Sequence, residues 1–239
     1  MKRAVEDVAV KIKKYFDCQE RDPIIFSNEL HLQMHLAQFL VGEGYTILYE
    51  YHVPAACFSN INEMVYPWRT KKNYPQKMYL DLVVKINNEY IPIEIKYKTR
   101  ALKKDTQIFD EEKRDVELLR NQGAQDWGMY GFWKDVHRLE LVCDIFNTVK
   151  NGIALFVTND PLYYNRQNRD NKEVNYYNFR MEEGRIVKGP MEWIDSDSDS
   201  AKRQPKFNLL RSYKVAWHSI GPHSDPSNPE NFSYCFVIV

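Results

Sequence analysis

The sequence predicts a mixed α/β fold, in which a central sheet carries helices on both of its faces. Two strand-like segments, at 78–86 and 90–97, are joined by a short connection that suits a hairpin. A long helical pattern follows at about 127–149, with apolar residues every three or four positions. The nearly all-apolar segment 153–158 has the character of a strand that is buried on both faces. Strand, long helix and buried strand together indicate a βαβ unit with a right-handed crossover.

A further helix is expected before the hairpin. Residues 27–41 start at a good N-cap, Ser27 or Asn28, and Gly42 or Gly44 ends the helical pattern. Apolar residues occupy most sides of this segment, so we expect a helix that is well buried against the sheet.

The other segments of the first two-thirds of the chain are less regular. Residues 45–53 are rich in aromatic and β-branched side chains, which predicts a strand. Residues 55–77 lack a clean period, so an irregular excursion is expected there. One short helical pattern, at 111–120, lies within the polar stretch 99–125.

The last third of the chain has weaker patterns. Residues 165–175 are polar and are expected to form a mobile loop, and the Asp-Ser repeat at 195–200 is expected to be disordered. Two late segments, 213–218 and 234–239, are predicted to be strands that extend the sheet. We find no repeat and no linker, so a single domain over 1–239 is predicted.

The composition and charge of the chain argue against several classes of protein. The 239 residues carry a formal net charge of zero, which argues against a protein that coats nucleic acid through bulk positive charge. The charged, amphipathic stretch 4–16 does not look like a signal peptide, and no run is long enough to span a bilayer. The four cysteines are widely spaced, which indicates neither a zinc site nor a disulfide framework. A soluble cytoplasmic protein is therefore expected.

The most informative feature is a set of charged residues in the predicted hairpin. Asp81 stands inside an apolar strand pattern, and the partner strand carries Glu94 and Lys96. Side chains alternate along a strand, so Glu94 and Lys96 share one face, and pairing brings Asp81 close to them. Two carboxylates at such a distance repel each other unless a cation lies between them, and oxygen ligands suit Mg²⁺ or Mn²⁺.

This order of residues resembles the PD-(D/E)XK nuclease superfamily, which has the restriction-endonuclease-like fold. Twelve residues separate Asp81 from Glu94, which is followed by one residue and Lys96. Glu29, in the first turn of the predicted helix, matches the acidic residue that many members add. The predicted order of helix, three strands, helix and strand (αβββαβ) is similar to the family core. One position departs from the pattern, because Leu80 stands where the family name has proline.

The resemblance covers a core at about 25–160 and leaves 161–239 as a C-terminal extension. It implies a metal-dependent DNA endonuclease of the restriction, defence or repair type, for which a homodimer would suit the cutting of two strands. Lys96 would position or help deprotonate the attacking water. The implied ligands of Mg²⁺ or Mn²⁺ are Asp81, Glu94, the Ile95 carbonyl and Glu29. The candidate contacts to nucleic acid are Gln33, Lys98, Arg100, Lys103 and Lys104.

Other interpretations remain open at this point. The same fold could serve as a non-catalytic nucleic-acid-binding or accessory subunit, and misassigned strands would leave room for an unrelated carboxylate enzyme. Glu29, taken alone, could be present because a carboxylate is stabilised by the positive end of a helix dipole. Glu94 and Lys96 could belong to an exposed cross-strand pattern of charges. His31 and His35 stand four apart, as zinc-binding histidines do, but Leu32 occupies the position of the glutamate that a zincin motif needs. For these two histidines, helix packing or surface exposure is expected.

Overall fold

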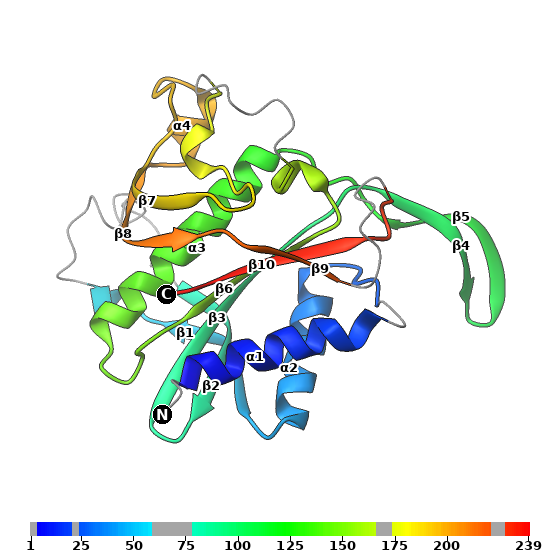
Figure 1. The fold of residues 1–239 in the computed structure, drawn as a ribbon, viewed down its shortest axis with the longest axis horizontal. Coiled ribbons are helices and arrows are strands. Elements are labelled where there is room, and N and C mark those ends of the chain that lie inside the picture. The colour runs from blue at the N-terminus through cyan, green and yellow to red at the C-terminus, as the bar shows by residue number, and fades with distance from the viewer. Residues whose placement is uncertain (1–3, 21–23, 59–77, 166–173, 221–227) are drawn as a thin grey trace.

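The computed structural model describes residues 4–20, 24–58, 78–165, 174–220 and 228–239. They form a mixed α and β structure in which helices surround a six-stranded sheet (Figure 1). The helices and strands, in chain order, are α1 (Ala4–Asp17), α2 (Glu29–Gly42), β1 (Thr46–Val53), β2 (Met78–Ile86), β3 (Glu89–Lys98), β4 (Leu102–Ile108), β5 (Glu111–Leu119), α3 (Gln125–Ile145), β6 (Ile153–Thr158), β7 (Ile186–Met191), α4 (Asp199–Arg203), β8 (Phe207–Lys214), β9 (Trp217–Ile220) and β10 (Phe232–Ile238). The predicted order of helix, three strands, helix and strand is confirmed, with the β4–β5 hairpin inserted before α3.

The main sheet has the strand order β1-β2-β3-β6-β10-β9. The pair β3–β6 is parallel, with Glu94 opposite Ala154, and the other neighbouring pairs are antiparallel. This mixed sheet confirms the predicted βαβ unit, in which α3 connects two parallel strands. Every residue of β6 is buried, as expected for a central strand.

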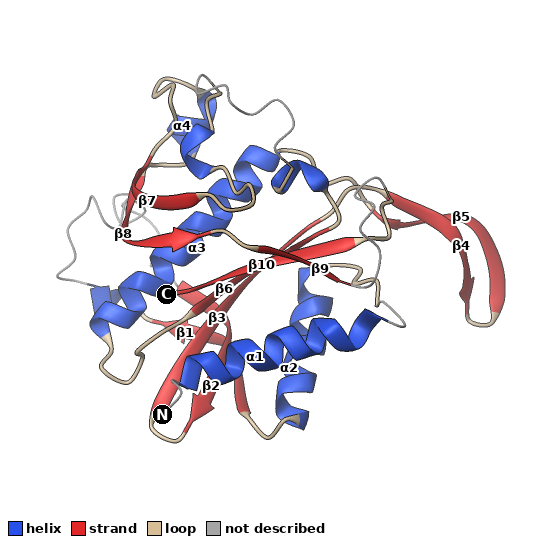
Figure 2. Ribbon diagram, viewed as in Figure 1, coloured by secondary structure: helices blue, strands red, loops and turns tan. Residues whose placement is uncertain are grey.

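Helices cover both faces of this sheet (Figure 2). One face packs against α1 and α2 through a core that includes Leu36, Ile95 and Leu155. The other face packs against α3 through a second core that includes Trp133 and Phe156. The odd-numbered apolar residues of β3 from Ile91 to Tyr97 therefore pack in the core with α1 and α2, whereas Glu94 and Lys96 face the layer that contains α3.

Helix α2 has the predicted start but not the predicted burial. The Asn28 side chain accepts a hydrogen bond from the backbone N–H of His31, which makes Asn28 the N-cap. The outer side of the helix exposes Leu30, Met34 and Val41, each at least half accessible. The expectation of a well-buried helix was therefore wrong for its outer side, because only one side of α2 meets the sheet.

The helix predicted at 111–120 is wrong, because these residues form β5, which pairs with β4. Ile108 lies opposite Glu111, so the loop between them is Phe109-Asp110, and both residues have positive φ, 52° and 65°. Such a two-residue turn usually carries Asn-Gly or Asp-Gly, and without these residues no hairpin was predicted here. The hairpin extends away from the main sheet (Figure 1).

Two further expectations need correction. Helix α3 ends at Ile145 rather than near 149, and the chain then turns so that the Thr148 carbonyl accepts the Tyr90 N–H. The segment 195–200 is ordered and not disordered, because Ser198 caps α4.

The predicted late strand 213–218 is divided between two sheets. Strand β8 pairs with β7 in a separate ribbon, and β9 joins β10 in the main sheet as predicted. Most of the predicted irregular excursion (59–77) and most of the predicted polar loop (166–173) lie outside the described residues.

Candidate active site

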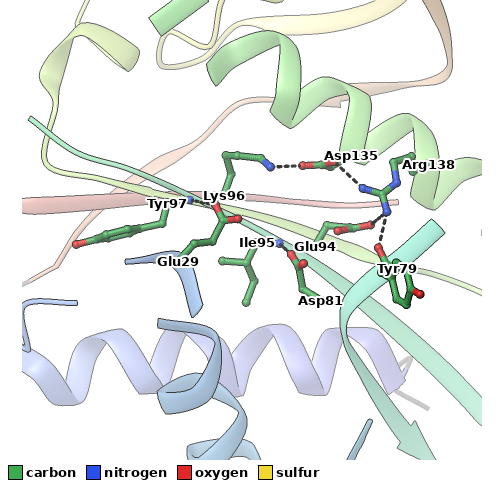
Figure 3. A network of polar contacts seen from close by, with 9 residues as sticks. All are labelled: Glu29, Tyr79, Asp81, Glu94, Ile95, Lys96, Tyr97, Asp135 and Arg138. Atoms are coloured by element: carbon green, nitrogen blue, oxygen red, sulfur yellow. Dashed lines mark hydrogen bonds and ion pairs between the residues drawn. The ribbon is translucent and has the colours of Figure 1, made fainter. Parts of the chain in front are cut away.

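The site begins where strands β2 and β3 part. Their backbone pairing ends at Leu82 and Ile93, one residue before Asp81 and Glu94. At this point the side chain of Asp81 replaces the missing backbone partner, since the Ile95 N–H donates to Asp81 Oδ2 at 2.6 Å (Figure 3). Asp81 therefore accepts a hydrogen bond from a backbone N–H of β3 that has no backbone partner on β2, because the two strands separate at this point.

Glu29 satisfies the next free donor along β3. The Tyr97 N–H donates to Glu29 Oε2 at 2.8 Å, and the Tyr97 hydroxyl donates to the carbonyl of Phe26 at 2.7 Å. These two bonds tie the start of α2 and the residues just before it to β3, and Figure 3 shows the first of them. They bring Glu29 and Asp81 to neighbouring positions on the same edge of the strand, as the sequence predicted.

Gln33 fixes the backbone of β2 beside this edge. Its side chain is buried, and Nε2 donates to the carbonyl of Asp81 at 2.6 Å and to Glu50 Oε1 at 3.0 Å. Because both bonds use the amide nitrogen, the side chain holds Asp81 in place. The predicted contact of Gln33 with nucleic acid stays a prediction, and its observed role is structural.

Glu94 lies on the other side of β3 and is 3 % exposed. Its Oε1 is 3.1 Å from Arg138 Nη2 on α3 but accepts no hydrogen bond in the described structure. Arg138 also pairs with Asp135 at 3.2 Å and donates to the Tyr79 carbonyl (Figure 3). Burial raises the pKa of Glu94 well above its usual value, and the charges of Asp135 and Asp81 raise it further, against the opposing effect of Arg138.

Lys96 is held by Asp135, whose Oδ2 is 3.0 Å from Nζ. The charge of Asp135 raises the pKa of Lys96, and Glu29 and Glu94 raise it further, although burial acts in the opposite direction. The ammonium therefore keeps its proton at ordinary pH. This state suits the positioning of a water molecule and the stabilisation of negative charge, and it does not suit the removal of a proton.

Negative charge is in excess around Asp81. Burial raises the pKa of Asp81 to about 6, the charges of Asp135 and Glu29 raise it as well, and the Ile95 N–H lowers it. Lys96 and Arg138 make ion pairs with Asp135 and Glu94, whereas Asp81 and Glu29 accept hydrogen bonds from backbone N–H groups and have no ion pair within the described residues. Lys98 lies near Lys96 and Glu29, and burial lowers its pKa.

The donor set fits a hard divalent cation. Asp81 and Glu94 supply carboxylate oxygens, and the carbonyl of Ile95 lies on the same edge of β3 as its N–H, beside Asp81. Among the residues that the structure describes, no group of three or more His, Cys, Asp or Glu side chains is arranged to hold a metal. Mg²⁺ needs no such cage, because it keeps several waters and binds through one or two carboxylates together with substrate phosphates.

The structure thus brings together the four residues that the sequence predicted, Glu29, Asp81, Glu94 and Lys96 (Figure 3). Sequence reasoning missed two neighbours on α3, Asp135 and Arg138. The sequence signal that could have identified them is a pair of opposite charges three residues apart inside an apolar helix pattern. In the structure Asp135 is 6 % exposed, which is unusual for a charged residue.

Two of the basic residues predicted to contact nucleic acid are neutralised by acidic partners. Lys103 lies 3.5 Å from Asp115, and Lys104 lies 3.2 Å from Glu230. The backbone N–H of Arg100 donates to Asn159 Oδ1. Contacts of Lys98, Arg100, Lys103 and Lys104 with nucleic acid remain predictions.

Comparisons with known proteins add no family to this picture: no family model, curated protein or solved structure matches the chain. The resemblance to PD-(D/E)XK nucleases therefore depends on the site residues and on the order of the elements. Within the described residues, no helix combines the length and the apolar character that crossing a membrane requires.

Proposed function

We propose that this chain hydrolyses phosphodiester bonds of nucleic acid, with Mg²⁺ or Mn²⁺ as its cofactor and DNA as its substrate. One observation carries the proposal: the carboxylates of Asp81 and Glu94 stand on either strand of a hairpin at the point where its backbone pairing ends, with Lys96 beside them. A carboxylate pair can hold the ion of a metal-assisted attack of water on a phosphate, and a protonated amine can stabilise the negative charge that develops.

The ligands in this proposal are the oxygens at the parted end of β2 and β3. Asp81, Glu94 and the Ile95 carbonyl would hold the ion, and Glu29 would bind through water or complete a second site. A bound divalent ion polarises the phosphate and makes a water molecule more acidic. The bond from the Ile95 N–H fixes the Asp81 carboxylate before any ion arrives.

Lys96 acts as a fixed positive charge in this proposal. Its ion pair with Asp135 sets the direction of the side chain and keeps the ammonium protonated. From this position Lys96 orients the attacking water and stabilises the negative charge that develops on the phosphate. Asp135 is a positioning residue, because it acts through Lys96.

We further propose that the chain is a member of the PD-(D/E)XK superfamily that has Leu80 in place of the proline of the motif. The order α2, β1, β2, β3, α3, β6 supports this assignment, as does the placement of Glu29 beside Asp81. We place the activity in the cytoplasm, where the described cysteines, which are all free, stay reduced. A homodimer would allow cleavage of both strands of a duplex.

The proposal is tested with plasmid, linear and branched DNA in Mg²⁺, Mn²⁺ and EDTA. We expect Asp81→Asn, which keeps an oxygen for the Ile95 N–H but loses the charge, to cleave at least ~10²–10³-fold more slowly. Lys96→Met is expected to lose a similar factor. Two exposed positions, Asp110→Asn and Lys150→Met, serve as controls that leave the rate unchanged. Cleavage that persists in EDTA, or full activity in both site variants, would contradict the proposal.

A second candidate function is a nucleic-acid-binding or accessory subunit without turnover. The observation that favours it is that Glu94 and Lys96 are already neutralised by Arg138 and Asp135. Calorimetric titration with Mn²⁺ separates the two candidates. The accessory subunit binds DNA with a steep salt dependence, but it takes up no Mn²⁺ at Asp81 and Glu94.

A further inference from the structure

Two histidines on α2 hold their ring nitrogens at the distance of two ligands of one metal ion. His31 Nε2 and His35 Nε2 are 3.0 Å apart, and the two rings meet edge to face. Imidazole nitrogens bind Zn²⁺ and similar ions at about 2.0–2.1 Å, so two neighbouring ligands of one ion lie roughly 3.0–3.4 Å apart. The spacing of the two nitrogens therefore suits one ion, once the rings turn so that both nitrogens point at it.

The structure around the pair orients both rings. Phe26, which is buried, packs edge to face against His31 at 5.8 Å and against His35 at 5.7 Å between ring centroids. The Ser27 N–H donates to His31 Nδ1 at 3.2 Å, so the proton of this ring is on Nε2 and points at His35. An ion on Nε2 requires the other tautomer of His31: the Nε2 proton leaves to solvent, and Nδ1 takes one up that it can donate to the Ser27 hydroxyl oxygen at 3.3 Å. The hydrogen bond from the Ser27 N–H to Nδ1 is then lost.

The pair is separate from the carboxylate site on the same helix. Glu29 and Gln33 point toward β3 and β2, whereas residues two positions apart on a helix do not share a face. His31 and His35 instead line an open hollow at the surface, together with Met34, Gln38 and other residues of α2 and β1. Water or an added donor can therefore reach an ion held there.

We propose that His31 and His35 form a two-nitrogen site for a transition-metal ion of the Zn²⁺, Ni²⁺ or Cu²⁺ class. Imidazole suits these ions, whereas the oxygen donors around Asp81 suit Mg²⁺. No third His, Cys, Asp or Glu of the described chain joins the pair, so water completes the coordination. The ion links the first two turns of α2, the helix that also carries Glu29, and thereby stabilises the N-terminal end of that helix. The proposal does not depend on nuclease activity.

The test is a metal titration of the full chain, free of any affinity tag and stripped with a chelator that is then removed. Co²⁺, Ni²⁺ and Zn²⁺ are added in excess Mg²⁺, with calorimetry and the visible spectrum of Co²⁺ as readouts. One equivalent is expected to bind, and His31→Gln or His35→Gln is expected to weaken it more than tenfold. Two controls keep the affinity: His52→Gln, an exposed histidine of β1, and Asp81→Asn, which removes a carboxylate of the other site.

A measurement on the unmodified chain guards against variants that fail to fold. Paramagnetic Ni²⁺ is expected to broaden the side-chain nitrogen resonances of His31 and His35 before those of the other histidines. Equal affinity in the wild type and both histidine variants would overturn the proposal. So would binding that disappears only in Asp81→Asn, or broadening that begins at other histidines.

Discussion

The two sides of β3 hold their charged groups in different ways (Figure 3). On the side of α2, Asp81 and Glu29 accept hydrogen bonds from backbone N–H groups of the strand itself. On the side of α3, Glu94 and Lys96 are held by side chains of the helix through ion pairs. The backbone cannot move away without breaking the sheet, whereas a side chain can change its rotamer.

This difference indicates a division of roles within the candidate site. The α2 side presents a carboxylate in one fixed position, and the α3 side can exchange partners. Arg138 supplies the positive charge that a buried Glu94 needs, and Glu94 Oε1 still accepts no hydrogen bond. Under the proposed function, a divalent ion would take over part of the contact that Arg138 makes. The predictions below test this contrast, from the largest expected effect to the smallest.

The largest effect is expected on the α3 side, from Arg138→Met. This change leaves Glu94 buried without its counter-charge, and breaking a buried ion pair costs about 3–5 kcal/mol of unfolding free energy. Because its pKa is already raised by burial, Glu94 can take up a proton at low pH. The loss is therefore expected to be larger at pH 8 than at pH 5, as measured by urea unfolding.

The double variant Glu94→Gln with Arg138→Met is the control, because it removes both charges together. We expect it to recover most of the stability that the single change loses. If the double variant is no more stable than Arg138→Met, the ion pair is not what holds this side of the strand.

The next effect concerns the α2 side and the pH dependence of stability without metal. The folded pKa of Asp81, about 6, is above its ordinary value of 3.8, so the folded chain binds more protons between these values. Stability is therefore expected to decrease as pH rises from about 4 to about 6, and the contribution of Asp81 is about 3 kcal/mol. Asp81→Asn, unfolded in urea with EDTA, should lack this decrease. An identical pH profile in both proteins would show that Asp81 ionises as it does in the unfolded chain.

How far the sequence predicts this molecule depends on whether a feature is local. The β2–β3 hairpin, the start of α2 and the buried β6 follow from periodicity and capping over short stretches, and all were predicted. The β4–β5 hairpin was not, because Phe109 and Asp110 adopt positive φ without the usual turn residues. The charges along β5 also lack the apolar alternation that marks a half-buried strand.

The candidate site, too, could be predicted only where its residues lie close together in the sequence. Asp81, Glu94 and Lys96 lie close in sequence, so strand pairing alone predicts that they meet. Asp135 and Arg138 follow about forty residues later and reach the site only because α3 packs across the sheet. No local sequence pattern indicates how α3 packs on the sheet. The partners of Glu94 and Lys96 could therefore not be predicted.

A smaller effect is expected from Gln33→Ala. This change tests whether the α2 side of β3 needs the side chain of Gln33 to hold Asp81 in position. The change removes both bonds of the amide and lets the β2 backbone at Asp81 move. Loss of such an outer contact typically lowers metal affinity or activity by about 10–100-fold. The measurement is Mn²⁺ affinity by calorimetry, with Gln38→Ala, an exposed glutamine of the same helix, as the matched control. Equal Mn²⁺ affinity in both variants would show that Asp81 needs no support from α2.

The smallest effect is expected from Glu29→Gln, because the new side chain can still accept the Tyr97 N–H. The unfolding free energy is expected to change by less than about 1 kcal/mol, since the hydrogen bond is kept and only a partly exposed charge is lost. The charge of Glu29 nevertheless acts on Asp81 and Lys96, so Mn²⁺ affinity should fall by up to about tenfold. Glu29→Ala, which also removes the hydrogen bond, separates the two roles. If Glu29→Gln keeps full Mn²⁺ affinity while Glu29→Ala loses stability, then Glu29 ties α2 to the strand and contributes nothing to the binding of the ion.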